Sequence, residues 1–483
     1  MTAVAGLDVG TTGVKAVAIS PDGSVLATAE RSYPLSTPHP GWSEQDPEDW
    51  WRAAESAIAE IAAGRELAGI GLSGQMHGLV ALDADERVIR PSILWNDQRT
   101  AAECEEIEDL LGLARLIELT GNRALPGFTA PKLLWLRRHE PDAYRRIHHV
   151  LLPKDYVRLR LTGEHAIDVA DASGTLLLDV AGRRWSDEVL DALEIPSSWL
   201  PPVLESPAVS GTTAAGIPVA AGAGDCAAAG LGVGVDRPGG PVSIVLGTSG
   251  VVFAALPAYR PDEQARAHVF CHAVPGAWHA MGVMLSAAGS LQWLHDTIAP
   301  DVPFDALIAE AGAWPPGAEG LVFLPYLQGE RTPHADPNAR GAFTGLQLRH
   351  DRGALVRAVL EGVAFGLRDS LDILRSLGIE VSSARASGGG ARSKLWLRIC
   401  ASVLDVPIER TVAEEGSAFG AALLGGVAGG VYADVHAAVA ATVHTKDVVE
   451  PDPEWARVYG EQHQRYRALY PALRDLDRST VEG

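Results

Sequence analysis

Cysteine and lysine are both scarce in this chain of 483 residues. The four cysteines lie far apart and form no CxxC pair; they are Cys104, Cys226, Cys271 and Cys400. Widely spaced cysteines argue against a disulfide framework and against a structural zinc site. We therefore expect free thiols, as in the reducing cytoplasm.

The sequence also lacks the features of a nucleic-acid-binding or membrane protein. Acidic residues outnumber basic ones by 61 to 40, a formal net charge of −21, and no basic block offsets the excess. Such a chain repels polyphosphate backbones and anionic lipid surfaces. The longest weakly polar stretches, residues 214–235 and 419–431, are studded with small residues, and neither is typical of a membrane helix. Because Asp8 interrupts the start, we expect no signal peptide and a cytoplasmic location.

What is present suffices for two globular domains. Apolar residues make up 47% of the chain and charged residues 21%, and the length is two to three times that of a usual domain. Strands and helices alternate in the predicted pattern, which is typical of the α/β class. The main predicted helices span residues 50–63, 131–139, 352–377 and 394–404, and two of the predicted strands span residues 67–72 and 217–221.

A repeat relates the two halves of the chain. Residues 4–20 predict a strand, a Gly-Thr-Thr-Gly turn and a second strand, and residues 243–256 predict the same plan around Gly-Thr-Ser-Gly. A β-hairpin turn alone would explain either segment. Two matching turns half a chain apart favour two related domains, in which Thr11, Thr12 and Thr248 help to cradle phosphate.

An acidic residue distinguishes the first repeat from the second. Asp8 precedes the first turn by two residues, and its counterpart in the second repeat is Val245. A carboxylate beside a phosphate-binding turn would repel the phosphates unless it holds a cation, directly or through water. The Mg²⁺ that accompanies a nucleotide would supply that cation.

Asp225 has two interpretations from its position between a predicted strand and a helix-prone segment. As a structural residue it would be the N-cap of the following helix. As a functional residue it would lie at the carboxyl end of a strand, where sites of α/β proteins gather, and would accept a proton during phosphoryl transfer.

Other motifs admit a structural and a functional interpretation in the same way. Three glycines after a strand, including Gly389 and Gly390, predict either a tight turn or a surface for a flat ring or phosphate. Met76 and His77 follow another strand and would serve in core packing or in a site. Trp95 with its polar neighbours would hold a sugar or end a strand. Two further groups are most simply structural: His268, His272 and His279, and an ion-paired loop at Glu330 and Arg331.

Together these segments resemble the FGGY carbohydrate kinases nearly from end to end. The resemblance is carried by LDVGTTGVK from Leu7, GWSEQDPEDWW from Gly41, SGQMHG from Ser73, ILWNDQR from Ile93, LLPKDYVRLRLTGE from Leu151, GDCAAAGLGVG from Gly224, LGTSGVVF from Leu246 and FLPYLQGERTPH from Phe323. Residues 127–139 and 415–424 are similar to the two signatures of the family. Within it, the motifs are most similar to those of the bacterial members that act on D-xylulose.

The resemblance implies an actin-like ATPase fold: two RNase-H-like domains around a central cleft that holds ATP and sugar. The expected divisions are an N-terminal domain over residues 1–240, a C-terminal domain over 241–455 and a helical tail over 456–483. It also implies transfer of phosphate from ATP, with Mg²⁺, to the 5-hydroxyl of D-xylulose. A homodimer is a further expectation from the family.

Carried over residue by residue, the resemblance assigns a role to each motif. Asp225 would be the general base, and Asp8 would organise Mg²⁺ and the phosphates. Met76 and His77 would contact the sugar. The expected ATP-binding residues are Thr11, Thr12, Gly247 and Thr248 at the phosphates, and Gly389 and Gly390 on the adenosine side.

One departure from the family affects the sugar. Members that act on xylulose often carry Asn after the base, and here the residue is Cys226, whose thiol donates only weakly. The alternatives are a kinase of the same family for ribulose, gluconate or glycerol, and an actin-like nucleotide switch that needs no sugar.

Overall fold

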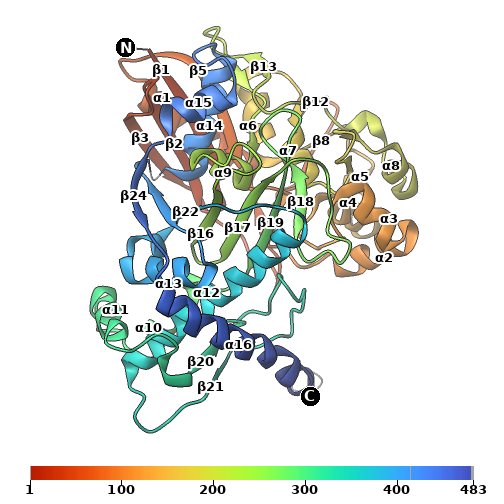
Figure 1. The fold of residues 1–483 in the computed structure, drawn as a ribbon. Helices are drawn as coiled ribbons and strands as arrows, with labels where there is room; N and C mark the ends of the chain where they lie inside the picture. The colour runs from red at the N-terminus through yellow and green to blue at the C-terminus, as the bar shows by residue number, and fades with distance from the viewer. Residues whose placement is uncertain (1, 414, 480–483) are drawn as a thin grey trace.

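Two seven-stranded sheets, one from each half of the chain, form the framework of this computed structural model, which describes residues 2–413 and 415–479 (Figure 1). The first sheet contains β13 (Val209–Thr212), β14 (Pro218–Ala220), β5 (Glu66–Gly74), β1 (Thr2–Val9), β2 (Gly13–Ile19) and β3 (Val25–Ser32) in this order, and β15 (Ala223–Gly224) also pairs with β5. The second contains β18 (His268–Cys271), β19 (Trp278–Met284), β17 (Gly250–Leu256), β16 (Val242–Leu246), β22 (Ala384–Ser387), β23 (Ile408–Thr411) and β24 (Thr445–Val449).

The two sheets share one topology. In the first, β3, β2 and β1 are antiparallel neighbours, and β5 and β14 continue the sheet parallel to β1. In the second, β19, β17 and β16 take the antiparallel places, and β22 and β23 continue parallel to β16. The same order and directions in both halves confirm the expected pair of related α/β domains.

Helices cover the sheets in the places that the sequence periodicity indicates. The expected helices are α1 (Pro47–Ala62), α4 (Thr129–His139), α12 (Arg352–Ser376) and α13 (Lys394–Leu404). On α1, Trp50, Ala54, Ala57 and Ile61 are buried at helical spacing against Leu7 and its neighbours on the first sheet.

The remaining helices of eight or more residues are α2 (Ala101–Leu111), α3 (Leu113–Thr120), α6 (Pro153–Thr162), α9 (Asp225–Gly232), α10 (Ala288–Ile298), α11 (Phe304–Gly312), α14 (Gly416–Ala428), α15 (Val435–Thr442) and α16 (Pro453–Ser479). Shorter helices are α5 (Pro141–Tyr144), α7 (Val169–Ser173) and α8 (Asp187–Leu193), and short strand pairs are β4 (Glu44–Gln45) with β7 (Ser92–Ile93), β6 (Val80–Leu82) with β8 (His149–Leu151), β9 (Ile167–Asp168) with β12 (Val203–Leu204), β10 (Leu178–Asp179) with β11 (Arg184–Trp185), and β20 (Val322–Leu324) with β21 (Ala342–Thr344).

Helix α14, from the second half of the chain, packs on the first sheet and on α9 (Figure 1). Small residues make this contact close: a Cβ atom on Gly71 would overlap the carbonyl oxygen of Ala421, and one on Gly420 would overlap that of Ala228. The glycine-rich stretches at residues 214–235 and 419–431 are therefore the two faces of one tight contact. No helix in the described part of the chain is long and apolar enough to cross a membrane.

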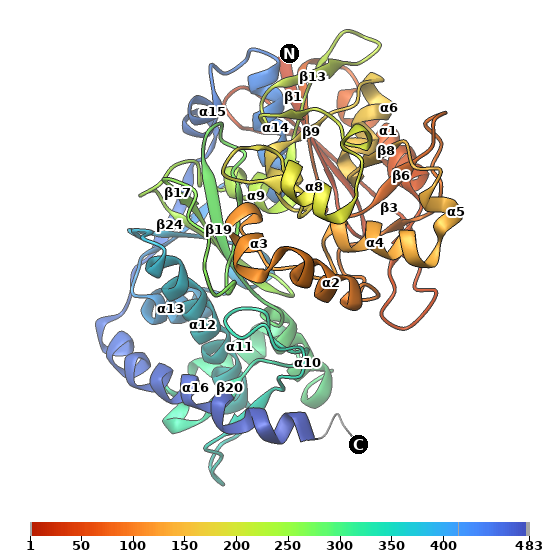
Figure 2. The same ribbon diagram turned by 90° about the vertical axis from the view of Figure 1, so that its right-hand side faces the viewer.

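The C-terminal helix α16 lies against α12, α13 and β20 (Figure 2). Its Tyr459 hydroxyl accepts from Arg357 at 2.6 Å and donates to Glu361 at 2.9 Å, and all three side chains are buried. The helix is thus part of the C-terminal core. Whether residues 1–240, 241–455 and 456–483 are separate units stays a prediction, and residues 1, 414 and 480–483 of these ranges lie outside the described residues.

Candidate functional site

Each of the two predicted turns joins two antiparallel strands. In the first, the Gly10 N–H donates to the Gly13 carbonyl oxygen at 3.0 Å, and Thr12 is exposed. In the second, the carbonyl oxygen of Thr248 accepts from the N–H groups of Ala287 and Gly289, at 2.8 and 3.1 Å. These bonds attach the second turn to the start of α10. Both turns thus lie at strand ends with an exposed threonine, as a phosphate-binding hairpin requires.

Asp8 lies on β1, opposite Ser73 of β5 in the ladder between these strands. The Ser73 hydroxyl donates to Asp8 Oδ1 at 3.1 Å. Burial raises the pKa of Asp8 to about 7, with help from the charge of Asp225, while Ser73 and Lys15 oppose the shift. The carboxyl group is therefore balanced between its two protonation states near neutral pH, and a cation beside it would favour the charged form.

Asp225 is the first residue of α9 and follows β15 directly. The N-cap is Gly224, so the structural interpretation of Asp225 as an N-cap is wrong. Its Oδ1 instead accepts from the N–H of Cys226 at 2.7 Å. Burial raises the pKa of Asp225, and the bonds from Cys226 lower it. A desolvated carboxylate with a raised pKa is a stronger base than one in water, as proton abstraction needs.

His77 has a backbone conformation that side chains rarely adopt, with φ at 71°. Two donors from α4 hold its carbonyl oxygen: Thr129 Oγ1 at 3.1 Å and Lys132 Nζ at 2.8 Å. Both belong to the segment that is similar to the first family signature. That signature therefore fixes the backbone at the end of β5.

The ring of His77 is fixed as well. Its Nδ1 lies 2.6 Å from the carbonyl oxygen of Gly174, and since a carbonyl oxygen only accepts, Nδ1 carries the proton. Burial lowers the pKa of His77 to about 3, so the ring is neutral at physiological pH. Nε2 is then an unprotonated acceptor, suited to a hydroxyl group of a ligand.

Met76, the neighbour of His77 in the chain, packs against the loop that carries Asp225. A Cβ atom on Gly224 would lie 2.7 Å from Met76 Cγ, so this side chain packs directly beneath the loop that carries Asp225. Phe128 and Phe270 complete the surroundings, with ring centroids 4.7 and 6.4 Å from that of His77. Phe270 comes from the second sheet, so both halves of the chain line this part of the site.

Trp95 lies beside the first turn. Its Nε1 donates to Thr11 Oγ1 at 3.0 Å, and 40% of the residue is exposed. Its neighbour Asp97 is buried and accepts from the Ser43 N–H at 2.6 Å. The exposed ring keeps the functional interpretation open for Trp95, and burial favours the structural one for Asp97.

The glycine loop separates two cavities. Gly389 lines both, one of about 650 Å³ shared with Gly247 and Thr248, and one of about 210 Å³ shared with Ser387 and Arg392. Gly390 is buried, and a Cβ atom there would lie 3.0 Å from the ring of Trp396. Gly389 therefore faces the open space, and Gly390 packs beneath it.

Sequence reasoning missed part of the larger cavity. Gln292 and Trp293 of α10 line it next to the second turn. The signal that could have indicated them is a polar residue beside an aromatic one, one turn after the start of α10. The start of this helix lies at the second Gly-Thr turn, because N–H groups there bind the Thr248 carbonyl oxygen.

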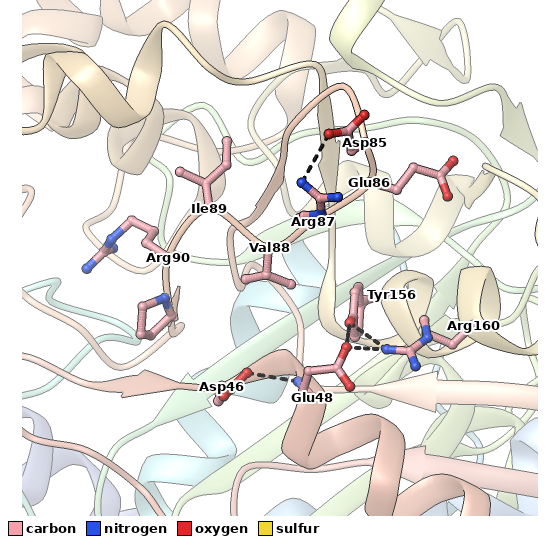
Figure 3. Close-up of a pocket in the computed structure, with 11 residues that line it drawn as sticks. Asp46, Glu48, Asp85, Glu86, Arg87, Val88, Ile89, Arg90, Tyr156 and Arg160 are labelled. Atoms are coloured by element: carbon pink, nitrogen blue, oxygen red, sulfur yellow. Dashed lines mark hydrogen bonds and ion pairs between the residues drawn. The ribbon is translucent and has the colours of Figure 1, made fainter.

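A further cavity, of about 680 Å³, lies between the start of α1, residues 85–91 and α6 (Figure 3). Its charged lining is largely paired internally: Glu48 binds Tyr156 and Arg160, and Asp85 binds Arg87 (Figure 3). None of the residues described above lines it. We assign it no role in the chemistry.

The residues at the first turn fit a magnesium ion. Within residues 2–413 and 415–479, no group of three metal-ligating side chains gathers. Mg²⁺ needs no such group, because it keeps several waters and binds one or two carboxylates together with substrate phosphates. Asp8, with its shifted pKa and the charge of Asp225 nearby, offers this donor set.

Known proteins are similar to this chain over nearly its whole length. Xylulose kinase of Escherichia coli (strain K12) is 43% identical over 98% of this chain and 99% of its own. A solved structure of a xyloylose kinase from Brucella ovis is 44% identical, with a TM-score of 0.93 over 98% of this chain and 100% of its own. A solved gluconate kinase from Lactobacillus acidophilus is 26% identical, also with a TM-score of 0.93, over 98% of each chain.

The family comparison covers both domains. Residues 3–232 match the N-terminal domain of the FGGY family of carbohydrate kinases, and residues 242–429 match its C-terminal domain. Residues 233–241 separate the two matches, and the second match begins with β16, the first strand of the second sheet along the chain. The chain therefore belongs to the FGGY family of carbohydrate kinases.

Proposed function

We propose that this protein transfers the γ-phosphoryl group of ATP to the 5-hydroxyl of D-xylulose and forms D-xylulose 5-phosphate. The observation that carries the proposal is the convergence of Asp8, Asp225 and the Met76–His77 pair at the end of β5. A relative named xylulose kinase, 43% identical over nearly the full chain, supports the choice of sugar.

Asp225 would be the general base. Its carboxylate would accept the proton of the 5-hydroxyl as the oxygen attacks the γ-phosphorus and the bond to the β-phosphate oxygen breaks. The Cys226 N–H binds Oδ1 of this carboxylate, and in the described residues no backbone group binds Oδ2, to which we assign the contact with the hydroxyl. Burial of the site keeps out the water that would otherwise hydrolyse ATP.

The two turns would hold the phosphates through their N–H groups and hydroxyls. We assign this role to Thr11, Thr12, Gly247 and Thr248. Asp8 would hold Mg²⁺ through water, and the ion, when bound, offsets the negative charge of the phosphates. Gly389 would approach the adenosine, and Gly390 would support the loop.

Met76 and His77 would position the sugar, with the unprotonated Nε2 of His77 accepting from a hydroxyl group. Cys226 replaces an amide that many relatives carry, so one sugar contact is weaker here. Four free cysteines also support a reducing compartment such as the cytoplasm. A homodimer stays an expectation from the family.

The fold alone does not choose the sugar, because a gluconate kinase shares it with a TM-score of 0.93. The test is ADP release with Mg-ATP and D-xylulose, compared with D-ribulose, L-xylulose, glycerol, gluconate and no sugar. Stimulation by D-xylulose above all others is the expected result. Preference for another polyol would keep the kinase and move its substrate, and ADP release indifferent to every sugar would contradict the proposal.

A further inference from the structure

The loop of Glu330, Arg331 and Thr332 is fixed to the end of β19 by its backbone and by one carboxylate. Glu330 Oε1 accepts from the N–H groups of Leu285 and Arg331, at 3.0 and 2.7 Å. The Thr332 N–H donates to the Val283 carbonyl oxygen at 3.0 Å. The carboxylate of Glu330 is thus bound to backbone groups, so the expected ion pair between Glu330 and Arg331 is wrong.

The guanidinium group of Arg331 has no hydrogen bond or ion pair within residues 2–413 and 415–479. The fully buried cations of these residues all have partners; they are Lys132, Lys154, Arg158 and Arg357. Arg331 is only partly exposed, and burial lowers its pKa. A desolvated cation without a partner is costly, so its retention at a fixed position indicates a ligand.

Glu330 offsets this charge only in part at neutral pH. Burial raises the pKa of Glu330 to about 8, and its Oε2 is buried without a hydrogen bond in the described residues. The carboxyl group is therefore largely protonated at pH 7. The positive charge of Arg331 is available to a bound molecule.

The anchor on β19 places the loop of Arg331 close to the residues around His77. In the ladder of β18 and β19, His268 lies opposite Met281, two residues before Val283. The ring centroid of Phe128 lies 6.1 Å from that of His268 and 4.7 Å from that of His77. Burial is the main cause of the lowered pKa of His77 and His268, and the positive charge of Arg331 adds to it. Burial raises the pKa of Cys226, and the charge of Arg331 opposes that shift.

We propose that Arg331 is a substrate-binding residue of the C-terminal domain, whose guanidinium donates hydrogen bonds to oxygen atoms of the sugar. The inference rests on the proposed function and adds a sugar contact to it. The loop of Arg331 is attached to Val283, which packs in the same apolar cluster as Met76 and Cys226. This position lies beside the proposed sugar-binding residues.

The proposal gives the sugar one anchor in each domain. His77 belongs to the first half of the chain and Arg331 to the second, so a bound sugar bridges them. Since a guanidinium presents five donors in a rigid fork, it suits two neighbouring oxygen atoms of a polyol. Sugar binding would then draw the domains together and assemble the site for transfer.

The test compares Arg331→Gln and Arg331→Lys with the wild type. Titration calorimetry with D-xylulose and no nucleotide measures sugar affinity, and ADP release measures kcat and KM. We expect the Kd and KM for the sugar to rise at least tenfold in Arg331→Gln, and less in Arg331→Lys, because hydrogen bonds from charged groups are worth that much. The Kd for ATP and the sugar-free hydrolysis of ATP should equal those of the wild type.

Arg266→Gln is the matched control. Arg266 lies beside the same loop, since Thr332 Oγ1 donates to its carbonyl oxygen at 2.8 Å, but its guanidinium is already paired with Asp262 at 2.8 Å. We expect unchanged sugar affinity in this variant. We also expect Arg331→Gln to melt at or above the wild-type temperature, because it removes an unpaired charge.

An unchanged sugar Kd in folded Arg331→Gln would overturn the proposal, and so would a loss of kcat alone, which would assign Arg331 to the phosphoryl group. Wild-type protein that binds D-xylulose without turnover would contradict the proposed function and leave the binding comparison intact. Should the wild type prefer another polyol of the panel, the same comparison with that polyol decides.

Discussion

Asp8 and Asp225 lie near Ser73 at the carboxyl end of β5, Asp8 on β1 and Asp225 at the start of α9. Asp8 is paired with Ser73 between β1 and β5, and Ala223, two residues before Asp225, is paired with Ser73 on the other side. The charge of Asp225 raises the pKa of Asp8. Two nearby carboxylates repel one another when both are charged, unless a cation offsets their charge. The Mg²⁺ of phosphoryl transfer would be such a cation.

Asp225→Asn should abolish most of the turnover and leave ATP binding intact. The amide keeps the size of the side chain but cannot accept the proton, so kcat should fall at least about 10³-fold. ADP release measures kcat, and calorimetry measures the Kd for ATP. Asp187→Asn is a matched control, because Asp187 also begins a helix and is exposed. Wild-type kcat in Asp225→Asn would refute the base.

The pH dependence of kcat/KM should report Asp8. Because its pKa is raised to about 7, a growing fraction of free enzyme carries a neutral Asp8 as pH falls below 7, and kcat/KM should decline accordingly. The profile from pH 5.5 to 9 measures this. A flat profile from pH 6 to 8 would contradict the assignment.

The same shift predicts an effect on stability. The pKa of Asp8 is about 7 in the folded protein and 3.8 in the unfolded chain. Between these pH values the folded protein holds a proton on Asp8 that the unfolded chain has lost. The free energy of unfolding therefore decreases as pH rises toward 7, where the folded protein loses this proton too. Asp8→Asn should therefore raise the free energy of unfolding of ligand-free protein at pH 8 by about 1–2 kcal/mol. Melting curves at pH 5 and 8 should differ less in the variant than in the wild type.

Lys132→Met should weaken sugar binding through His77. The variant leaves the carbonyl oxygens of His77 and Gly127 without the Lys132 donor, at a cost of about 1–3 kcal/mol in stability. With His77 less well held, we expect the KM for the sugar to rise several-fold while the KM for ATP stays unchanged. Lys446→Met, at an exposed position, should change neither. An equal rise in both KM values would indicate a general structural role.

Gly71→Ala should destabilise the contact between the first sheet and α14. The new methyl group would overlap the Ala421 carbonyl oxygen, and backbone must move, at a cost of about 1–3 kcal/mol or more. Gly460→Ala on α16 is the opposite case, because a Cβ atom there meets nothing within 4 Å, and it should stabilise the protein by about 0.5–1 kcal/mol. Denaturant titration measures both. Equal stability of the two variants would contradict the packing argument.

Local chemistry explains what could be predicted of the site. The two Gly-Thr turns, the positions of Asp8 and Met76–His77, and the helix over Lys394–Leu404 are read from neighbouring residues, and the structure has them as expected. Turn residues and periodic apolar residues determine such elements within a few positions of themselves.

Asp225 and Arg331 mark the limit of that method. Sequence alone left Asp225 between an N-cap and a base. One residue of helix register excludes the N-cap, and the role as base stays a prediction. Sequence alone also paired Arg331 with its neighbour, whereas Glu330 turned its carboxylate to the backbone of Leu285, 45 residues away in the chain.

The sequence by itself determined the two repeated α/β units, the two Gly-Thr turns and the residue types available for chemistry, because these depend on short-range patterns. Only the tertiary structure decided which of those residues meet. The packing of α14 on the first sheet, the shifted pKa of Asp8 beside Asp225 and the action of the Arg331 charge on His77 all arise from residues more than 50 positions apart. Burial and distance between such residues set their charges, and no local pattern encodes them.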